Sequence, residues 1–262
     1  MNKQFTFTNF RFALLGTAVL ALSPFTSSAE PGSDLAGRLK AKQDGSTFVR
    51  LRMETGAEKQ ILQLQIKSRV SGGSADIVYQ VLFPKERKGE SVLLHRSGEK
   101  SGGTLFTPLN NTRPIGSGQL NQPLFGSDLS YEDIIDNPFT WSQQSIVGAE
   151  TINGTACQIL ESKPGSGHKS SYSKVRTWVD VSRLVPLRIE KYDASGKVSR
   201  RINTTRVMLD GDESIPSNLS VQSPRGTTEL DGSRIKRAVT YSDTEFTQEC
   251  LKQLSAPSNS PN

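Results

Sequence analysis

The stretch FGSDLSYEDI, residues 125–134, places three acids, two serines and one tyrosine within ten positions. Such a cluster has the groups needed for acid–base catalysis or for binding a divalent cation. The spacing also fits the first turn of a helix, with Ser130 as the N-cap and Asp133 closing a capping box. Glu132 and Asp133 then lie where the helix dipole favours negative charge. We therefore interpret these acids as a helix N-terminus, entered through a turn at Gly126, and not as a catalytic pair.

The other reactive residue types are too scattered to suggest an enzyme. The two histidines, His95 and His168, have no second histidine or cysteine at metal-ligand spacing. The chain has no G-x-S-x-G nucleophile elbow. GEKSGG (98–103) lacks the spacing of a phosphate-binding loop, and DGDE (210–213) lacks the frame of a calcium hand, so we expect a loop and a turn there. The sequence predicts no catalysis, no cofactor and no metal.

The first 29 residues have the features of a secretory signal peptide. Lys3 and Arg11 precede an apolar run that ends near residue 25, and small residues follow up to Ala29. The run is shorter than the roughly 20 residues that a spanning helix needs. We expect cleavage after Ala29 and export to the periplasm, a single β domain over residues 30–254, and a disordered tail over 255–262.

Charge and cysteine content restrict the partners further. Loss of Lys3 and Arg11 lowers the formal net charge from +6 to about +4. The basic residues around Arg200-Arg201 and Lys236-Arg237 are interpreted as a solvated outer face of strands, so no nucleic-acid partner is expected. Cys157 and Cys250 are the two cysteines, and an oxidising compartment favours a disulfide between them.

Alternation of apolar and polar residues predicts a mainly β chain of some eight to eleven antiparallel strands. The runs with this period are 47–55, 60–68, 76–83, 90–96, 155–162, 174–181, 186–193 and 197–209. Turn residues at 72–73, 153–154 and 194–196 separate several of them. Helices are expected only over 33–45, over 242–254 and after Ser130.

A wide curved sheet with one apolar face and few helices to cover it leaves room for a cavity, which would suit a lipid or acyl chain. A fully packed core is the alternative that the sequence leaves open. The residues expected to face inward on the first strands are Val49, Leu51, Met53, Leu62, Leu64, Ile66, Ile77, Tyr79, Val81 and Phe83.

The motif Phe125, Gly126, Ser127, Asp128, Ser130, Tyr131, Glu132 and Asp133 resembles a signature of the outer-membrane lipoprotein-sorting protein family, the relatives of the periplasmic carrier LolA. Residues 177–201, TWVDVSRLVPLRIEKYDASGKVSRR, resemble that family's tryptophan strand, proline-leucine strand and hairpin. A loop, LFTPLNNTRPI (105–115), precedes the motif. The resemblance runs from about Thr47 to Phe246.

The resemblance implies an unclosed antiparallel half-barrel with a few short helices covering its concave face. It also implies a monomeric periplasmic carrier of a lipid or lipoprotein acyl chain, working between an inner-membrane exporter and an outer-membrane acceptor. An envelope-stress sensor with the same half-barrel, binding a membrane protein partner, is the alternative.

Overall fold

The computed structural model describes residues 31–56, 59–109 and 111–253. The expected signal peptide and C-terminal tail lie outside these residues. Within them, no helix is long and apolar enough to cross a membrane.

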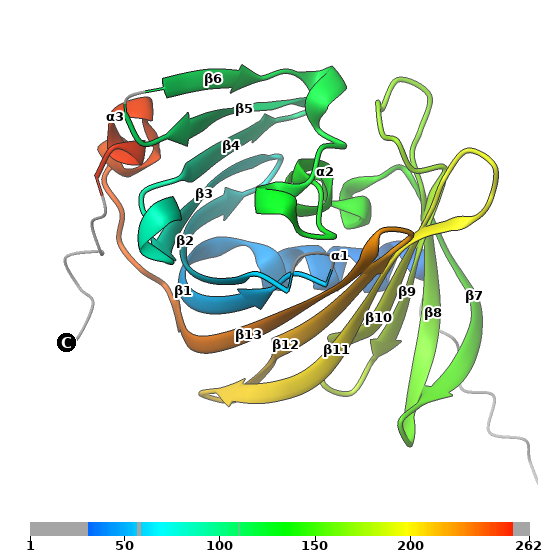
Figure 1. The fold of residues 1–262 in the computed structure, drawn as a ribbon. Coiled ribbons are helices and arrows are strands. Elements are labelled where there is room, and N and C mark those ends of the chain that lie inside the picture. The colour runs from blue at the N-terminus through cyan, green and yellow to red at the C-terminus, as the bar shows by residue number, and fades with distance from the viewer. Residues whose placement is uncertain (1–30, 57–58, 110, 254–262) are drawn as a thin grey trace, which may run out of the picture.

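One antiparallel sheet of 13 strands forms the body of the protein, and it curves into a trough (Figure 1). The strand order is β6-β5-β4-β3-β2-β1-β13-β12-β11-β10-β9-β8-β7, so β6 and β7 are the two edges and the sheet does not close. The mainly β, unclosed half-barrel predicted from the sequence is confirmed. The strands are β1 Gly45–Glu54, β2 Ile61–Ser71, β3 Ser74–Phe83, β4 Ser91–Ser97, β5 Lys100–Thr107, β6 Asn111–Ile115, β7 Gln143–Ile152, β8 Thr155–Lys163, β9 Lys174–Asp180, β10 Val185–Tyr192, β11 Val198–Asp210, β12 Glu213–Ser223 and β13 Gly226–Arg237.

All eight strands predicted from alternation are present, because alternation reports a half-buried sheet face directly. Five strands were missed: β5, β6, β7, β12 and β13. The predicted loops over 98–103 and 105–115 are wrong, since these residues largely form the β5–β6 hairpin. Gly103 explains part of this error. A Cβ there would lie 2.3 Å from Leu93 O, so close packing requires a glycine that weakens the strand pattern.

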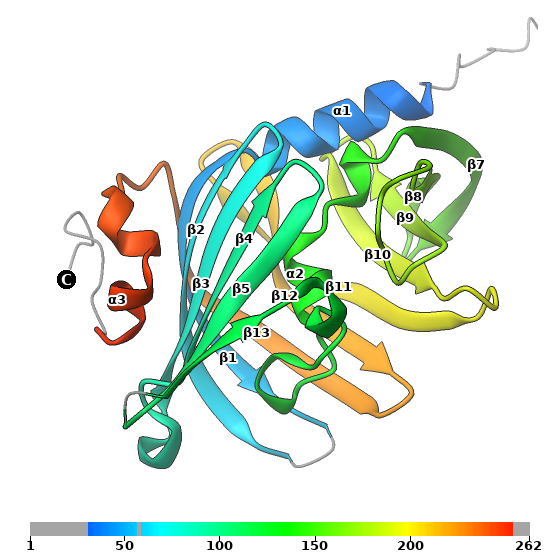
Figure 2. The ribbon, with the colours of Figure 1, turned by 90° about the horizontal axis from the view of Figure 1, so that it is seen from above.

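The segment between β6 and β7 lies inside the trough (Figures 1 and 2). We call residues 117–140 the inner segment; it contains η2 Ser117–Gln119, η3 Leu124–Gly126, α2 Tyr131–Ile135 and η4 Pro138–Thr140. Leu124, Phe125, Tyr131 and Ile135 are buried against the inward faces of β1–β4, β12 and β13. The part of the concave face formed by these strands is therefore packed under the inner segment.

Two further helices cover other surfaces. Helix α1 (Gly32–Gln43) lies across one end of the trough and buries Leu35 and Leu39 against β8, β9 and η4 (Figure 2). The C-terminal helix is shorter than predicted: it consists of η5 (Asp243–Phe246) and α3 (Gln248–Leu251). It lies on the outer, convex face of β2–β5, with Phe246 and Leu251 packed on Val78 and Leu93. The short helices expected over the concave face are therefore those of the inner segment, whereas the C-terminal helix lies outside it.

The predicted Cys157–Cys250 disulfide is not formed; both cysteines are buried free thiols. Cys157 lies on β8 among Trp178 and its neighbours, whereas Cys250 lies over β2 with Sγ 4.0 Å from Lys67 Nζ. Six strands separate β8 from β2 in the sheet order. Seven inter-strand steps of roughly 4.8 Å place them about 34 Å apart along the outer surface, far beyond the reach of a bridge.

The protein should therefore carry two titratable thiols. We expect thiol titration of unreduced, denatured protein to find two per chain, and the folded protein to react slowly because burial raises the pKa of both thiols. Absence of titratable thiols in the unreduced sample would contradict the observed strand arrangement.

Candidate functional site

The first half of the signature ties the inner segment to the β12–β13 hairpin. Thr228 Oγ1 accepts a hydrogen bond from the backbone N–H of Asp128 (2.9 Å) and donates one to its carboxylate (2.8 Å). Ser223 Oγ donates to the same carboxylate, and Arg225 donates to Ser127 O. Gly126 has φ 85°, as expected for the turn that leads into this anchor.

Ser130 caps α2 as the sequence predicted. Its Oγ accepts a hydrogen bond from Asp133 N (3.1 Å), while its own N–H donates to Asp133 Oδ2 (2.7 Å). This reciprocal pair satisfies two N–H groups that a helix start would otherwise leave unbonded. The predicted helix start, with Ser130 as the N-cap and Asp133 closing the capping box, is confirmed.

Asp133 also does what the sequence did not suggest: it joins the inner segment to the opposite wall of the trough. Its fully buried carboxylate lies 2.9 Å from Lys191 Nζ on β10 and 3.1 Å from Arg200 Nε on β11. Tyr172 Oη donates a further hydrogen bond of 2.6 Å. Burial opposes ionisation, but Lys191 and the hydrogen bonds from Tyr172 and Ser130 outweigh it and hold the pKa of Asp133 well below its usual range.

Glu132 attaches the same helix to the loop before β9. Its carboxylate accepts hydrogen bonds from Ser170 Oγ (2.7 Å), Ser171 N (2.7 Å) and Ser171 Oγ. The two adjacent acids of the signature therefore hold α2 to one wall, while its apolar side packs on the other wall.

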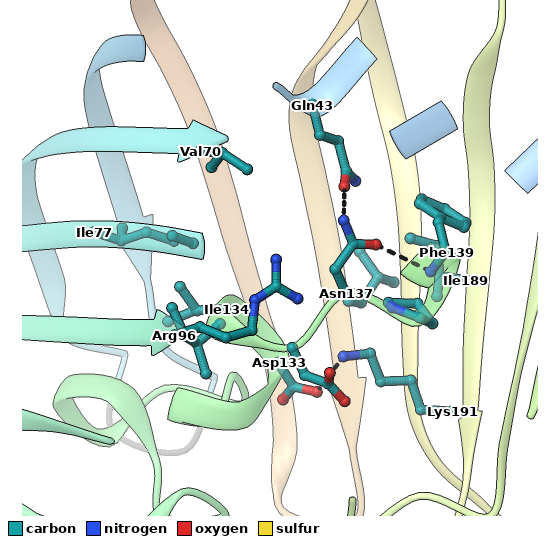
Figure 3. Close-up of a pocket in the computed structure, with 15 residues that line it drawn as sticks. Gln43, Val70, Ile77, Arg96, Asp133, Ile134, Asn137, Phe139, Ile189 and Lys191 are labelled. Atoms are coloured by element: carbon teal, nitrogen blue, oxygen red, sulfur yellow. Dashed lines mark hydrogen bonds and ion pairs between the residues drawn. The ribbon is translucent and has the colours of Figure 1, made fainter. Parts of the chain in front are cut away.

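A cavity of ≈ 270 Å³ remains between the walls, bounded by α2, η4 and the end of α1 (Figure 3). Its apolar lining comes from both halves of the sheet and from α2: Val70, Ala75, Ile77, Ile134, Ile135, Ile189 and Ile202. Asn137 donates to Gln43 Oε1 (2.6 Å) and closes the end near α1. Charged groups at the cavity are Arg96, Asp133, Asp136 and Lys191.

The residues predicted to line a lipid cavity fall into three groups. Met53, Leu62, Leu64 and Val81 are at most 1% exposed and pack under the inner segment. Leu51, Ile66 and Tyr79 are partly buried against the same cluster, and Val49 lines a separate pocket beside α1. Phe83 is half exposed at the end of β3. Of the ten residues expected to face inward, Ile77 alone borders the cavity under α2.

Sequence reasoning missed Lys191 and Arg96 and misplaced Arg200. Arg200 is directed inward and its side chain is 14% exposed, so it is not part of a solvated outer face. The signal was present in the alternation itself. Arg96 follows Val92 and Leu94 in the inward register of β4, and Lys191 follows Ile189 in that of β10.

The histidines serve local contacts. His95 Nδ1 lies 2.7 Å from Asp76, and His168 Nε2 lies 3.3 Å from Asp136. In the part of the chain that the structure describes, no three His, Cys, Asp or Glu side chains gather as a metal site.

Replacing the N-cap should destabilise the protein modestly. Ser130→Ala removes the bond to Asp133 N, and we expect the free energy of unfolding to fall by about 1–2 kcal/mol, measured by urea denaturation. Ser117→Ala, at an exposed serine of η2, is the matched control and should change it by less than about 0.5 kcal/mol. Equal effects of the two substitutions would exclude the capping role.

Removing the buried carboxylate should cost more. Asp133→Asn leaves Lys191 and Arg200 without their counter-charge, and we expect a loss of about 3–5 kcal/mol near pH 7. Glu54→Gln, in an exposed pair with Arg52, should cost at most about 1 kcal/mol.

The Asp133 contribution should also depend on pH in one direction. Because the folded-state pKa of Asp133 is depressed, its contribution is complete above the unfolded value of about 3.9 and is lost as the pH falls towards the folded value. The difference in unfolding free energy between wild type and Asp133→Asn should be constant above about pH 5 and narrow below about pH 4. A difference that grows on acidification would refute this assignment.

Comparison with known proteins identifies the fold and the family. A DUF1329 family protein of Desulfovibrio piger is 22% identical, with 84% of this chain and 97% of that chain covered and a TM-score of 0.77. A Vibrio parahaemolyticus domain described as outer membrane lipoprotein-sorting is 23% identical, with 85% and 98% covered and a TM-score of 0.76. A LolA superfamily protein of Nitrosomonas europaea is 19% identical, with 85% and 100% covered and a TM-score of 0.67.

At these identities the likeness shows a shared fold, the LolA-like half-barrel that the signature suggested. Comparison with curated proteins finds no match. A family model described as "Uncharacterized protein" matches residues 73–253. Because this match spans more than half of the chain, the protein belongs to that family, and it folds as a LolA-like half-barrel.

Proposed function

We propose that this protein binds an acyl chain of a lipid or lipoprotein in the periplasm and carries it between the inner and outer membranes. The observation that carries the proposal is the cavity between the two walls of an unclosed sheet, lined by aliphatic side chains of both walls and of α2. The shared fold with a domain described as outer membrane lipoprotein-sorting supports the same role. A donor exporter and an outer-membrane acceptor complete the proposal.

The cavity volume suggests how loading would occur. At ≈ 270 Å³ it lies just below the range of about 300–1,000 Å³ typical of ligand sites. A long chain therefore enters only if the inner segment moves away from the wall formed by β1–β4. Such a movement would expose Met53, Leu62, Leu64 and Val81, and the inward residues expected from the sequence would then join the binding surface.

The polar anchors suggest which contacts persist during this movement. Asp128, Glu132 and Asp133 hold the inner segment to β10–β13 and to the loop before β9 through charged hydrogen bonds. Its contacts with β1–β4 are mostly apolar. Apolar contacts are non-directional, so an acyl chain can replace them without leaving unpaired polar groups.

Filling the cavity tests the proposal. Val70→Phe adds volume at the end of β2 where Val70 borders the cavity, and Val198→Phe, at an exposed position of β11, is the matched control. We expect wild type and Val198→Phe to bind a fluorescent fatty acid equally. Val70→Phe should bind it at least tenfold more weakly, about 1.4 kcal/mol, with a melting temperature close to that of wild type.

A wild-type protein that binds no acyl probe, including probe presented on vesicles, would reject the carrier proposal. A protein-binding module of the envelope would then be the better account of the fold. Val70→Phe binding as tightly as wild type would reject this cavity as the ligand site.

A further inference from the structure

Arg96 differs from the other charged groups at the cavity because no hydrogen bond or ion pair joins its side chain to another described residue. Its residue is 5% exposed, and its Nε is buried without a hydrogen-bond partner among residues 31–56, 59–109 and 111–253. No ion pair joins it to these residues either. Figure 3 shows the guanidinium directed from β4 into the space between the walls.

The two carboxylates that line the cavity are already engaged. Asp133 is held by Lys191 and Arg200, and Asp136 accepts from Trp141 Nε1 (3.4 Å) and lies 3.3 Å from His168 Nε2. Burial lowers the pKa of Arg96, and the charges of Asp136 and Asp44 only partly oppose this effect. A guanidinium stays protonated in proteins, so the described residues compensate its desolvation only in part.

A buried cation that is only partly compensated is costly beside an apolar cavity, and a ligand that supplies the counter-charge would lower the cost. Building on the proposed carrier function, we propose that the ligand is a single-chain amphiphile with an anionic oxygen headgroup, carboxylate or phosphate, which pairs with Arg96. Its hydrocarbon chain lies along Ile77, Ile134, Ile189 and Ile202. Carboxylate and phosphate both match the planar fork of a guanidinium, which can donate two parallel hydrogen bonds.

Lys191 and Arg200 are less suited than Arg96 to pair with the headgroup. Both face Asp133, whose carboxylate also accepts from Tyr172 and Ser130, so their charges are used within the fold.

Matched ligand pairs test the proposal on the intact mature protein. A fatty acid is compared with its methyl ester, and a lysophosphatidic acid with the monoacylglycerol of equal chain length, by displacement of a neutral fluorescent acyl probe at pH 7.5. Wild type should bind at least one anionic member tenfold or more tightly than its neutral partner. Which pair shows the preference distinguishes a carboxylate headgroup from a phosphate.

Arg96→Met removes the charge but keeps much of the side-chain volume. It should bind anionic and neutral members equally, and its melting temperature should equal or exceed that of wild type, because a buried charge that is only partly compensated is gone. Arg113→Met, at an exposed arginine of β6, should keep both the wild-type preference and the wild-type melting temperature.

The outcomes separate this inference from the carrier proposal. Equal binding of both members of each pair by wild type would overturn the anionic headgroup, with no variant needed, while leaving an acyl carrier in place. Displacement by inorganic phosphate without any preference for an anionic amphiphile would also overturn it, as would an unchanged preference in Arg96→Met. Failure of every acyl ligand to bind would reject both proposals.

Discussion

The buried Asp133 carboxylate is the constraint on which the arrangement of this protein depends. Lys191 and Arg200 lie directly opposite each other on β10 and β11, on the inward face of the sheet. Two like charges in such a position repel, and burial makes the repulsion worse. Asp133 lies between them and accepts from both, so the inner segment offsets the repulsion between β10 and β11.

The two walls hold the inner segment by different means. On the β1–β4 side, α2 and η3 bury aliphatic and aromatic side chains in the largest apolar cluster. On the β9–β13 side, three acids of the signature bind hydroxyls, backbone N–H groups and cations. Polar anchors fix position and register, whereas apolar contacts supply most of the burial energy and can be exchanged for another apolar surface. The inner segment therefore has one side held by polar contacts and one side held by apolar contacts.

The cavity lies where these two kinds of contact meet, and that location explains its mixed lining. The aliphatic residues from both walls continue the packed cluster, whereas Asp133, Lys191 and Asp136 belong to the polar anchors. Arg96 reaches the same space from the apolar wall. A natural core at this position would be expected to hold leucine or valine, as Val92 and Leu94 do earlier on the strand, so the arginine indicates a role outside packing.

The sequence by itself determined the local structure: period-2 alternation marked eight strands, and the S-x-x-D spacing marked the start of α2, because both depend on neighbouring residues only. Five strands were not predicted. In two of them, β5 and β12, glycine, serine and other polar residues obscure the alternation. The tertiary structure decided the rest. The pairing of β1 with β13 joins the two halves of the open sheet, and α3 lies on the convex face. Cys157 and Cys250 lie far apart, and Asp133 meets Lys191 and Arg200 from more than fifty residues away, since long-range contacts depend on how the whole sheet curves and not on sequence spacing.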